Sequence, residues 1–545
     1  MPTTRRKTAL TPSSTVRAPK VAVELSEQDV VIEGLARVVA DGWSARRAFA
    51  VARSRRSPEP LRIFVGGTDL CWQSTFMRSR WTLAVEGLGR IDRAEVEVGS
   101  LTLFVGDNNS GKTYLASLLW DFYARMPEVF LSDRAELEAL QASSRYQACT
   151  RWLDELPRSE PYTLTQGDID LILAWFNERL DEKKDAVVQR IFGRPGISIR
   201  GMRVQDLSLD ASISLILRPL PGGPSIEVAF TAVGYAPREP RTLDAEFVPN
   251  PSTSFGILVT LVAQLLSPNR LVGQLPRGYG AGDPVYFPAS RTGFMLLYKD
   301  VLADLIDWTT RGVVGVKSAP ISRIQLTVPV AHFLRLLAVG LRPDKVGPFS
   351  TEADLIERYA FPGTVALTGG VGVNEVEYHY SPDELALPMR LSSSLVTELA
   401  PLILVLRHAD SLPMLILEEP EAHLHPKLQR KLARVIARLV RKGVQVCITT
   451  HSPDFCQPIN NLIKLGSLAP EARATLQAKH GYEPQDYLDQ SEVTGHEFHV
   501  GGQGRSTVTR LEGSPSGLAI PTFNEELFAL SKEALELQGA VEGST

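Results

Sequence analysis

The spacing of apolar and polar residues changes near Trp81, where alternating strand and helix patterns begin. Leu101–Val105 is apolar throughout, which is typical of a strand buried on both faces of a mostly parallel sheet. A helix is predicted to follow over 112–125. The same order recurs later, in the apolar strand Met414–Leu417, a helix over 426–442 and the strand Val444–Thr449. Strands that alternate with helices in this way predict an α/β fold.

Weaker patterns complete the expected organisation. We expect strands over 197–232, 283–289 and 364–380, and helices over 254–267, 294–310, 328–341, 351–359 and 394–408. The charged residues 133–193 predict a helical insertion, and the remaining tail is mixed. Residues 1–20 predict a disordered tail, and residues 27–56 one or two helices. The predicted divisions are a basic arm at 1–80, core segments at 81–127, 201–292 and 361–545, and helical insertions at 128–200 and 293–360.

Composition places this organisation in an ordinary globular protein. Of 545 residues, 44% are hydrophobic and 22% charged, and the formal net charge of −4 gives no overall basis for binding nucleic acid. Any DNA-binding surface must therefore be local. Four cysteines without a CxxC motif suit a reducing cytoplasm and argue against a zinc ribbon. No apolar run of eighteen residues predicts a membrane span, and no signal peptide is recognisable.

A phosphate-binding loop joins the first buried strand to its helix. Residues 106–113 read GDNNSGKT and fit GxxxxGK[ST], with a strand before the loop and a helix after it. The backbone N–H groups of the loop, together with the helix N-terminus, can surround phosphate oxygens. Lys112 can reach the β- and γ-phosphates of a nucleotide, and the Thr113 hydroxyl can ligate Mg²⁺. The remaining predicted contacts come from Asn108, Asn109, Ser110 and Gly111.

Two further strands end in residues suited to phosphate chemistry. The apolar strand at 414–417 is followed by Glu418 and Glu419, at the position where α/β folds place their ligands. We expect Glu418 to hold the Mg²⁺ shell and Glu419 to act as the general base that polarises the attacking water. The strand at 444–449 is followed by His451, which can hydrogen-bond to the γ-phosphate. Taken singly, these residues also suit a solvated acidic turn and a structural histidine.

Together the segments "GDNNSGKT", "LILEEPEAHLHP" and "ITTHSP" resemble ABC-class ATPases grouped with OLD proteins, RecF and SMC heads. The resemblance covers residues 81–127 and 364–520. It implies an ABC-type head that binds ATP and Mg²⁺ and forms an ATP-sandwich homodimer or higher oligomer. A signature loop from one protomer would complete the site of the other. The matching segment is LSSSL at 391–395, in which serines replace both glycines of LSGGQ, and Ser392 and Ser394 are the predicted contacts.

Other features depart from the pattern or leave its meaning open. Glu418 replaces the usual aspartate, as in the OLD-like branch, and His425 stands where a D-loop aspartate would lie. His423 and His425 also suggest a metal pair beside Glu421, although no third ligand has useful spacing. Arg291, at the end of "YFPASR", is expected to reach either the nucleotide or the dimer interface. No glutamine loop or adenine-stacking residue is recognisable.

The sequence offers no second active site. OLD proteins usually carry a Toprim nuclease after the histidine loop, but no DxD cluster follows His451 here. Asp168 and Asp170 have that spacing, yet they lie in the helical insertion, where solvated surface is the better interpretation. The architecture resembles stand-alone ATPase subunits of bacterial anti-phage systems such as PARIS and Septu, whose effector is a separate protein such as a nuclease.

Two alternatives to a defence ATPase remain open. One is a repair or chromosome-maintenance ATPase of the RecF/SMC kind, which the lack of a long heptad coiled coil weakens. The other is a slowly hydrolysing scaffold that stores a partner. A row of arginines on the helix over 426–442 predicts either a solvated face or contact with DNA phosphates or an acidic partner. Its members are Arg430, Arg434, Arg438 and Arg441.

Overall fold

A computed structural model describes most of the chain, and it divides into two compact units, residues 1–74 and 75–545. The described residues are 49–51, 62–64, 79–125, 142–157, 160–193, 196–210, 212–219, 226–232, 254–266, 284–298, 326–341, 346–368, 377–383, 385–502 and 504–542. In the first unit, β1 (Phe49–Val51) pairs with β2 (Arg62–Phe64) in an antiparallel hairpin. The helix expected at 49–51 is therefore wrong, because these residues hydrogen-bond to a second strand. Residues 79–80 of the expected arm belong instead to the first strand of the second unit, and the remainder of the arm, including the tail at 1–20, lies outside the described residues.

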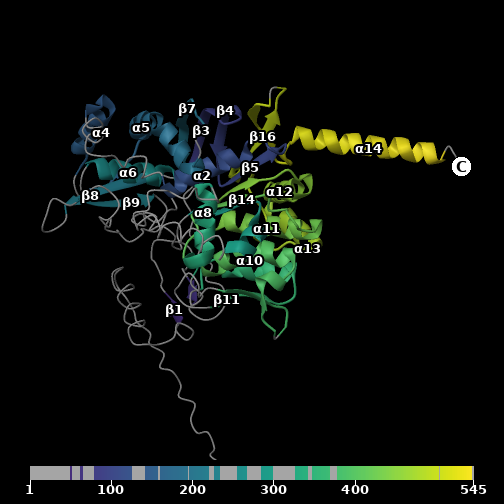
Figure 1. Ribbon diagram of the computed structural model, residues 1–545. Helices are drawn as coiled ribbons and strands as arrows, with labels where there is room; N and C mark the ends of the chain where they lie inside the picture. The colour runs from purple at the N-terminus through teal and green to yellow at the C-terminus, as the bar shows by residue number, and fades with distance from the viewer. Residues whose placement is uncertain are drawn as a thin grey trace, which may run out of the picture. The chain divides into compact units, whose positions relative to one another are not determined.

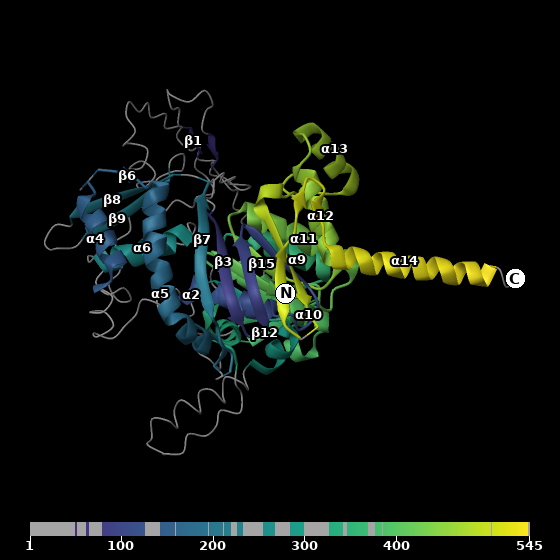
Figure 2. The ribbon, with the colours of Figure 1, turned by 90° about the horizontal axis from the view of Figure 1, so that it is seen from above.

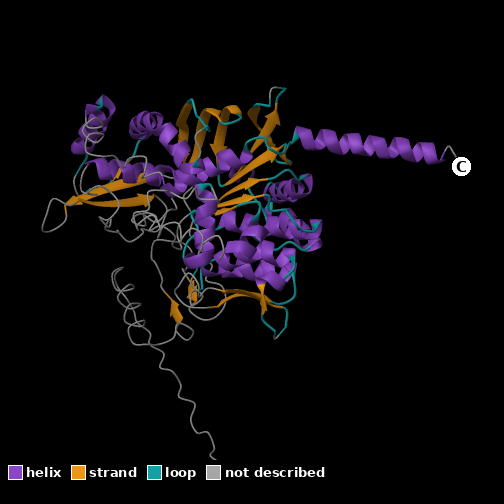
Figure 3. Ribbon diagram, in the orientation of Figure 1, coloured by secondary structure: helices purple, strands orange, loops and turns teal. Residues whose placement is uncertain are grey.

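The second unit is built on a nine-stranded sheet (Figure 3). Neighbouring strands are parallel from β10 to β16 and again between β17 and β4, and the other three pairings are antiparallel. In order across the sheet, the strands are β10 (Val285–Phe287), β14 (Met414–Glu418), β15 (Gln445–Thr449), β5 (Leu101–Gly106), β16 (Val493–Val500), β17 (Ser506–Arg510), β4 (Ile91–Val98), β3 (Ser79–Leu88) and β7 (Gly201–Leu209).

The register of the parallel strands brings three predicted motifs to one edge of this sheet. Strand β15 lies between β14 and β5, so that Thr449 is opposite both Glu418 and Phe104. The phosphate loop, the acidic turn and the histidine turn all follow directly from these strand ends. Because carboxyl ends of parallel strands share one edge, the motifs lie next to one another.

The sheet separates two apolar cores, since successive side chains of a buried strand point to opposite faces. Leu103 contributes to one core and Phe104 to the other. The first core is covered by α9 (Ser350–Ala360), α10 (Ser394–His408), α11 (Pro426–Arg441) and α12 (Pro453–Gly466), with α8 (Val328–Arg335) and the π-helical turn η3 (Leu336–Gly340) beside them. The second is covered by α2 (Lys112–Arg125), α4 (Ser144–Glu155), α5 (Gln166–Phe192) and α6 (Ser254–Leu266).

Smaller elements lie around this body (Figure 1). Two three-stranded antiparallel sheets contain β6 (Tyr162–Thr163), β8 (Ile213–Pro219) and β9 (Ile226–Ala232), and β11 (Thr364–Thr368), β12 (Glu377–Ser381) and β13 (Leu387–Pro388). The other short elements are η4 (Met389–Leu391), α13 (Pro470–His480), η5 (Gln490–Glu492), β18 (Gly513–Ser514) and β19 (Gly517–Leu518). A final helix, α14 (Pro521–Glu542), extends away from the body in both Figure 1 and Figure 2.

The predicted elements agree closely with the structure in the core. Helices α2 and α10 have the predicted bounds, and the α/β class with a mixed, mostly parallel sheet is confirmed. The helix expected over 294–310 is seen over 291–298, and the rest of it lies outside the described residues. Among the described residues, no helix is long and apolar enough to cross a membrane.

Candidate nucleotide site

The phosphate loop has a backbone that few residue types tolerate. Gly106 and Gly111 have φ of 119° and 99°, and Asn109 also lies in the left-handed region at 60°. A Cβ at Gly106 would lie 2.3 Å from the carbonyl oxygen of Phe498 on β16. Strand β16, which the sequence pattern did not identify, therefore requires glycine at this corner. The loop is held against the sheet, and its tip at 107–109 is exposed.

Lys112 points back into its own loop. Its Nζ donates hydrogen bonds to the carbonyl oxygens of Gly106 (2.8 Å) and Asp107 (2.6 Å). Burial lowers the pKa of Lys112, while the nearby carboxylates, Glu419 foremost, act to raise it. The ammonium group is thus held at the loop, where a phosphate would be bound.

Glu418 has the surroundings expected of a metal-binding carboxylate. It is 5% exposed, and this burial raises the pKa of its carboxyl group. Hydrogen bonds from Thr113, Tyr286 and the backbone of Ala289 act in the opposite direction and lower that pKa, but burial is the larger effect. The Ala289 N–H lies 3.3 Å from Oε2, whereas Oε1 is buried without a hydrogen-bond partner. An unpaired buried carboxylate oxygen near a hydroxyl group fits Mg²⁺, which prefers oxygen ligands. Thr113 and Glu418 are the residues that would hold the ion.

Glu419 lies beside His451 at the same edge. Its backbone has φ of 44°, and its N–H donates to the Thr449 carbonyl oxygen at 2.8 Å. The side chain is 34% exposed, and its Oε1 lies 3.7 Å from Nδ1 of His451. An uncommon left-handed conformation fixed by a neighbouring strand often marks a functional residue. The structure therefore brings Lys112, Glu418, Glu419 and His451 to one edge, as the sequence predicted.

Glu421 also belongs to this edge, although the sequence analysis gave it no role in phosphate chemistry. Its Oε1 accepts hydrogen bonds from Oγ1 of Thr450 (2.6 Å) and from the backbone N–H of His451 (3.2 Å). Burial raises the pKa of the Glu421 carboxyl group. The side chain thus orients the turn that carries His451. Its only sequence signal was its place as the third acid of EEPE.

Arg291 is buried and contacts the backbone of the acidic turn, while a contact of its side chain with the nucleotide or with a second protomer stays a prediction. It is 4% exposed, and its guanidinium donates to the carbonyl oxygens of Glu418 (2.6 Å) and Glu419 (3.1 Å). It also forms an ion pair with Glu398 of α10, which is 1% exposed. Arg291 therefore hydrogen-bonds to the backbone of the acidic turn from the protein interior and links this turn to α10.

The signature-like loop leads directly into α10. Ser393 is the N-cap residue, and its hydroxyl accepts from the Val396 N–H at 3.5 Å. Ser394 is the first helical residue and is exposed, whereas the Ser392 hydroxyl is buried without a hydrogen-bond partner. The role of these serines in the site of another protomer stays a prediction.

Other candidate groups have structural roles. His425 is exposed and caps α11, accepting from the Lys427 N–H at 3.2 Å, and no cluster of three metal-binding side chains occurs among the described residues. Asp168 is not solvated surface as expected. It is buried in the capping box of α5 with Thr165, and it accepts a hydrogen bond from Tyr162. It therefore holds a helix end.

The arginine row of α11 is largely covered, so a simple solvated face is the wrong description. Residues 481–489 pack along it and supply the partners of Arg434, Arg438 and Arg441. Arg438 is 3% exposed and pairs with Asp486 at 2.7 Å, while Arg434 and Arg441 stack on Tyr482 and Tyr487. Only Arg430 of the row is exposed. These contacts leave little of the row for DNA phosphates.

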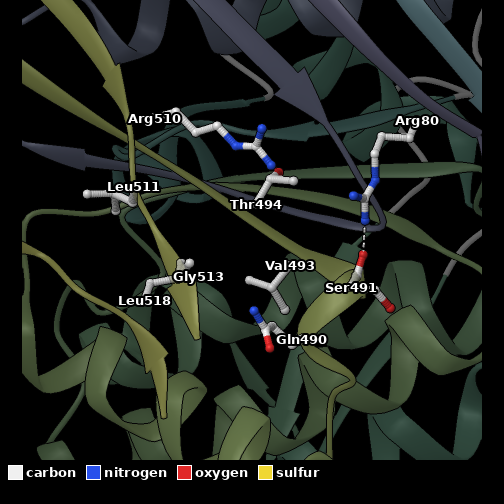
Figure 4. Close-up of a pocket in the computed structure, with 9 residues that line it drawn as sticks. All are labelled: Arg80, Gln490, Ser491, Val493, Thr494, Arg510, Leu511, Gly513 and Leu518. Atoms are coloured by element: carbon white, nitrogen blue, oxygen red, sulfur yellow. Dashed lines mark hydrogen bonds between the residues drawn. The ribbon is translucent and has the colours of Figure 1, made fainter. Parts of the chain in front are cut away.

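A cavity of about 440 Å³ lies at the other end of the sheet (Figure 4). Val493 lines it and pairs with Leu101, at the opposite end of β5 from Gly106. The cavity is lined by Arg80 and Arg510, which both pair with Glu97, at 3.1 Å and 2.6 Å. Because their charges are already shared with a carboxylate, we assign this cavity no part in the nucleotide site.

Comparison with known proteins supports a nucleotide-binding fold. Residues 238–456 match the family described as "AAA domain, putative AbiEii toxin, Type IV TA system". The matched segment contains the acidic strand and His451 but not the phosphate loop. No curated protein matches the chain.

Solved structures of SMC heads are also similar at low identity. The SmcHead bound to the C-winged helix domain of ScpA is 14% identical, with a TM-score of 0.32, over 79% of this chain and 97% of that one. The Pyrococcus furiosus Smc head bound to the C-terminal domain of ScpA is 12% identical, also with a TM-score of 0.32, over 84% and 99%. The Thermotoga maritima SMC head is 10% identical, with a TM-score of 0.28, over 79% and 99%. These likenesses carry no argument about the function of this chain.

Proposed function

We propose that this protein is a Mg²⁺-dependent ATPase that closes with a second copy on ATP and opens after hydrolysis. The proposal rests on one observation: Lys112, Glu418, Glu419 and His451 meet at one edge of the sheet. Lys112 would neutralise the β- and γ-phosphates, and the loop N–H groups would bind their oxygens. When bound, Mg²⁺ would supply charge neutralisation at the transferred phosphate.

The remaining residues of the edge have distinct roles in this proposal. Glu419 would accept the proton of the attacking water, and its partly exposed side chain is reachable by solvent. His451 would hydrogen-bond to the γ-phosphate while Glu421 holds its backbone. Because Glu419 and His451 lie 3.7 Å apart, loss of the γ-phosphate would change the surroundings of both side chains together.

The second copy would complete the site through the signature-like loop. The exposed start of α10, at Ser393 and Ser394, can present N–H groups to a phosphate, and Ser392 has a hydroxyl without a partner. Mixing two inactive variants tests this arrangement. Lys112→Ala should remove phosphate binding, and Ser394→Glu should repel the γ-phosphate of the facing protomer while remaining compatible with a helix N-terminus.

Each variant alone should be inactive, because every composite site then contains one defect. Random mixed dimers contain one fully intact site, so an equimolar mixture should recover roughly a quarter of wild-type turnover. Each variant mixed with wild type gives the reference rates. A mixture as inactive as its components, although both proteins are folded, would contradict sharing of the site between protomers.

For the biological role, we propose an ATPase subunit of an anti-phage system that controls a separate effector such as a nuclease. The description of the matched family includes the words "putative AbiEii toxin, Type IV TA system", which supports a defence role over repair or scaffolding. Co-purification with the product of a neighbouring gene, compared with ATP and with ADP, tests this role. Nuclease activity of this chain alone would contradict it, and DNA-stimulated turnover without an effector would favour the repair alternative.

A further inference from the structure

The final helix α14 is anchored firmly at its start and then leaves the body of the protein. The backbone N–H of Thr522 donates to Oε1 of Glu497 at 3.2 Å, and its hydroxyl donates to the same oxygen. Phe523 packs against the first apolar core. Beyond this turn the helix projects outward in both views (Figure 1 and Figure 2). Its direction is therefore set by the fold, while its length is available to another molecule.

The exposed part of α14 carries an apolar seam at heptad spacing. Starting from Phe523, apolar residues follow at intervals of four, three, four and three, namely Leu527, Leu530, Ala534 and Leu537. Leu527, Leu530 and Leu537 are 50%, 59% and 61% exposed. An alternation of three and four residues, here over two heptads, is the spacing by which helices pair in coiled coils. A solvated helix has no need of this regular spacing.

We propose that α14 pairs with α14 of a second copy of this chain as a parallel coiled coil. Every residue of the seam is apolar, so an identical helix offers a matching surface at each layer. The outward face, opposite the seam, carries the ion pair of Lys532 and Glu536 at 3.9 Å, two residues four apart. The exposed Phe528 and Leu535, at position b, also lie on the side away from the seam. Along α14 only the seam repeats apolar residues at intervals of three and four, so it is the surface that fits a partner helix.

The residues that flank the seam favour the parallel arrangement. In a parallel pair, Glu533 at position g faces Gln538 at position e of the second helix, which can donate a hydrogen bond to a carboxylate. In a fully overlapped antiparallel pair, g positions face one another, and Glu533 would meet its own counterpart. Like charges in contact oppose such a pair.

This pairing does not depend on the proposed nucleotide chemistry. Both copies would be joined through α14 in the absence of ATP, and closure of the heads would be a separate event within the joined pair. A tether of this kind raises the effective concentration of one head near the other. The inference therefore predicts association of full-length protein even when phosphate binding is removed.

Light scattering of the full chain without nucleotide, in the Lys112→Ala background, tests the proposal. The Lys112→Ala protein, which is the parent of the variants below, should be a dimer at micromolar concentration. Leu530→Glu with Leu537→Glu keeps good helix formers but places carboxylates in the seam, so the dimer should weaken at least tenfold. The matched control, Ala529→Glu with Lys532→Gln, makes the same charge change on the outward face and should not alter association. A monomeric parent, or equal weakening by both variants, would overturn the proposal.

Cysteine cross-linking tests the orientation independently of affinity. Leu537→Cys places identical residues opposite each other in a parallel pair, so mild oxidation should give a disulfide-linked dimer. Lys532→Cys, on the outward face, should remain unlinked, and the parent protein, whose described cysteines are buried, gives the background. Linkage through residue 532 but not residue 537 would refute the parallel seam.

Discussion

Arg291 and Glu398 form a buried ion pair that connects the acidic turn to the helix behind the signature-like loop. Arg291 also binds the backbone of Glu418 and Glu419, and Thr292 donates to Oε2 of Glu398 at 2.8 Å. A shift of α10 would therefore be transmitted to the residues proposed to bind Mg²⁺ and activate water. Buried charges of this kind need such partners, because an unpaired one is strongly unfavourable.

Glu398→Gln should lower kcat about tenfold while ATP affinity stays within about twofold, because it weakens the support of Glu419 without touching the phosphate loop. Steady-state kinetics and calorimetric ATP binding measure the two effects. Ile403→Val, a buried change on the same helix, should cost about 1 kcal/mol of stability and leave kcat unchanged. If both variants lower kcat equally, α10 acts only through general packing.

Lys112→Ala should abolish most ATP binding, because it removes the buried ammonium group that the loop carbonyl oxygens of Gly106 and Asp107 hold in place. The Arg90 guanidinium also donates to the loop, at Asn109, but it is exposed. Calorimetry on the folded variant measures this directly. Lys184→Ala, a surface lysine in a local pair with Asp181 on α5, serves as the control and should bind ATP normally. Wild-type affinity in Lys112→Ala would contradict the proposed site.

Glu419→Gln should bind ATP and Mg²⁺ yet hydrolyse on the order of a hundredfold more slowly, because the amide cannot accept the proton of water. The variant should accumulate as an ATP-bound closed form, visible as an ATP-dependent change in size. Glu418→Gln should instead weaken Mg²⁺ binding. Slow turnover with normal Mg²⁺ affinity in Glu418→Gln, and unchanged turnover in Glu419→Gln, would mean that the two roles are exchanged.

Arg438→Ala should destabilise the fold by about 3–5 kcal/mol, because it leaves the fully buried Asp486 without its closest cation. Arg430→Ala, on the same helix but exposed, should change the free energy of unfolding by less than about 0.5 kcal/mol. Chemical denaturation measures both. Equal stability of the two variants, with a steep salt-dependent loss of DNA affinity in Arg438→Ala, would restore the DNA-contact hypothesis.

His496 should make the protein sensitive to acid. Burial lowers the pKa of His496 to about 4, from an ordinary value near 6.5. The unfolded chain therefore takes up a proton first as pH falls, and up to about 3 kcal/mol of stability is lost between pH of about 6.5 and about 4. His496→Gln cannot titrate and can still donate to the Glu97 carbonyl oxygen. Its stability should fall less over this range, and an identical pH dependence would contradict the assignment.

The sequence determined the parts of the protein that local patterns encode. Uniformly apolar strands, the phosphate loop and the acidic turn sufficed to predict α/β architecture and the residues of the nucleotide edge. Helices α2 and α10 were bounded correctly because capping and phosphate-loop residues mark their starts. These signals involve residues close together in the sequence, so they can be recognised without knowledge of the fold.

The tertiary structure alone decided which polar residues are buried and what they contact. Strand β16 was missed because its pattern includes the polar residues His496 and Glu497. Both can be buried because residues far away in the sequence form hydrogen bonds with their side chains. Arg291 was assigned to the nucleotide or the interface, and the sequence did not show that it has partners within the chain more than a hundred residues away. The arginine row of α11 has the spacing of a surface that could contact DNA, but in the folded chain residues 481–489 cover it. The sequence shows that a buried polar side chain requires a hydrogen-bond or charged partner, but only the folded chain determines which partner it contacts.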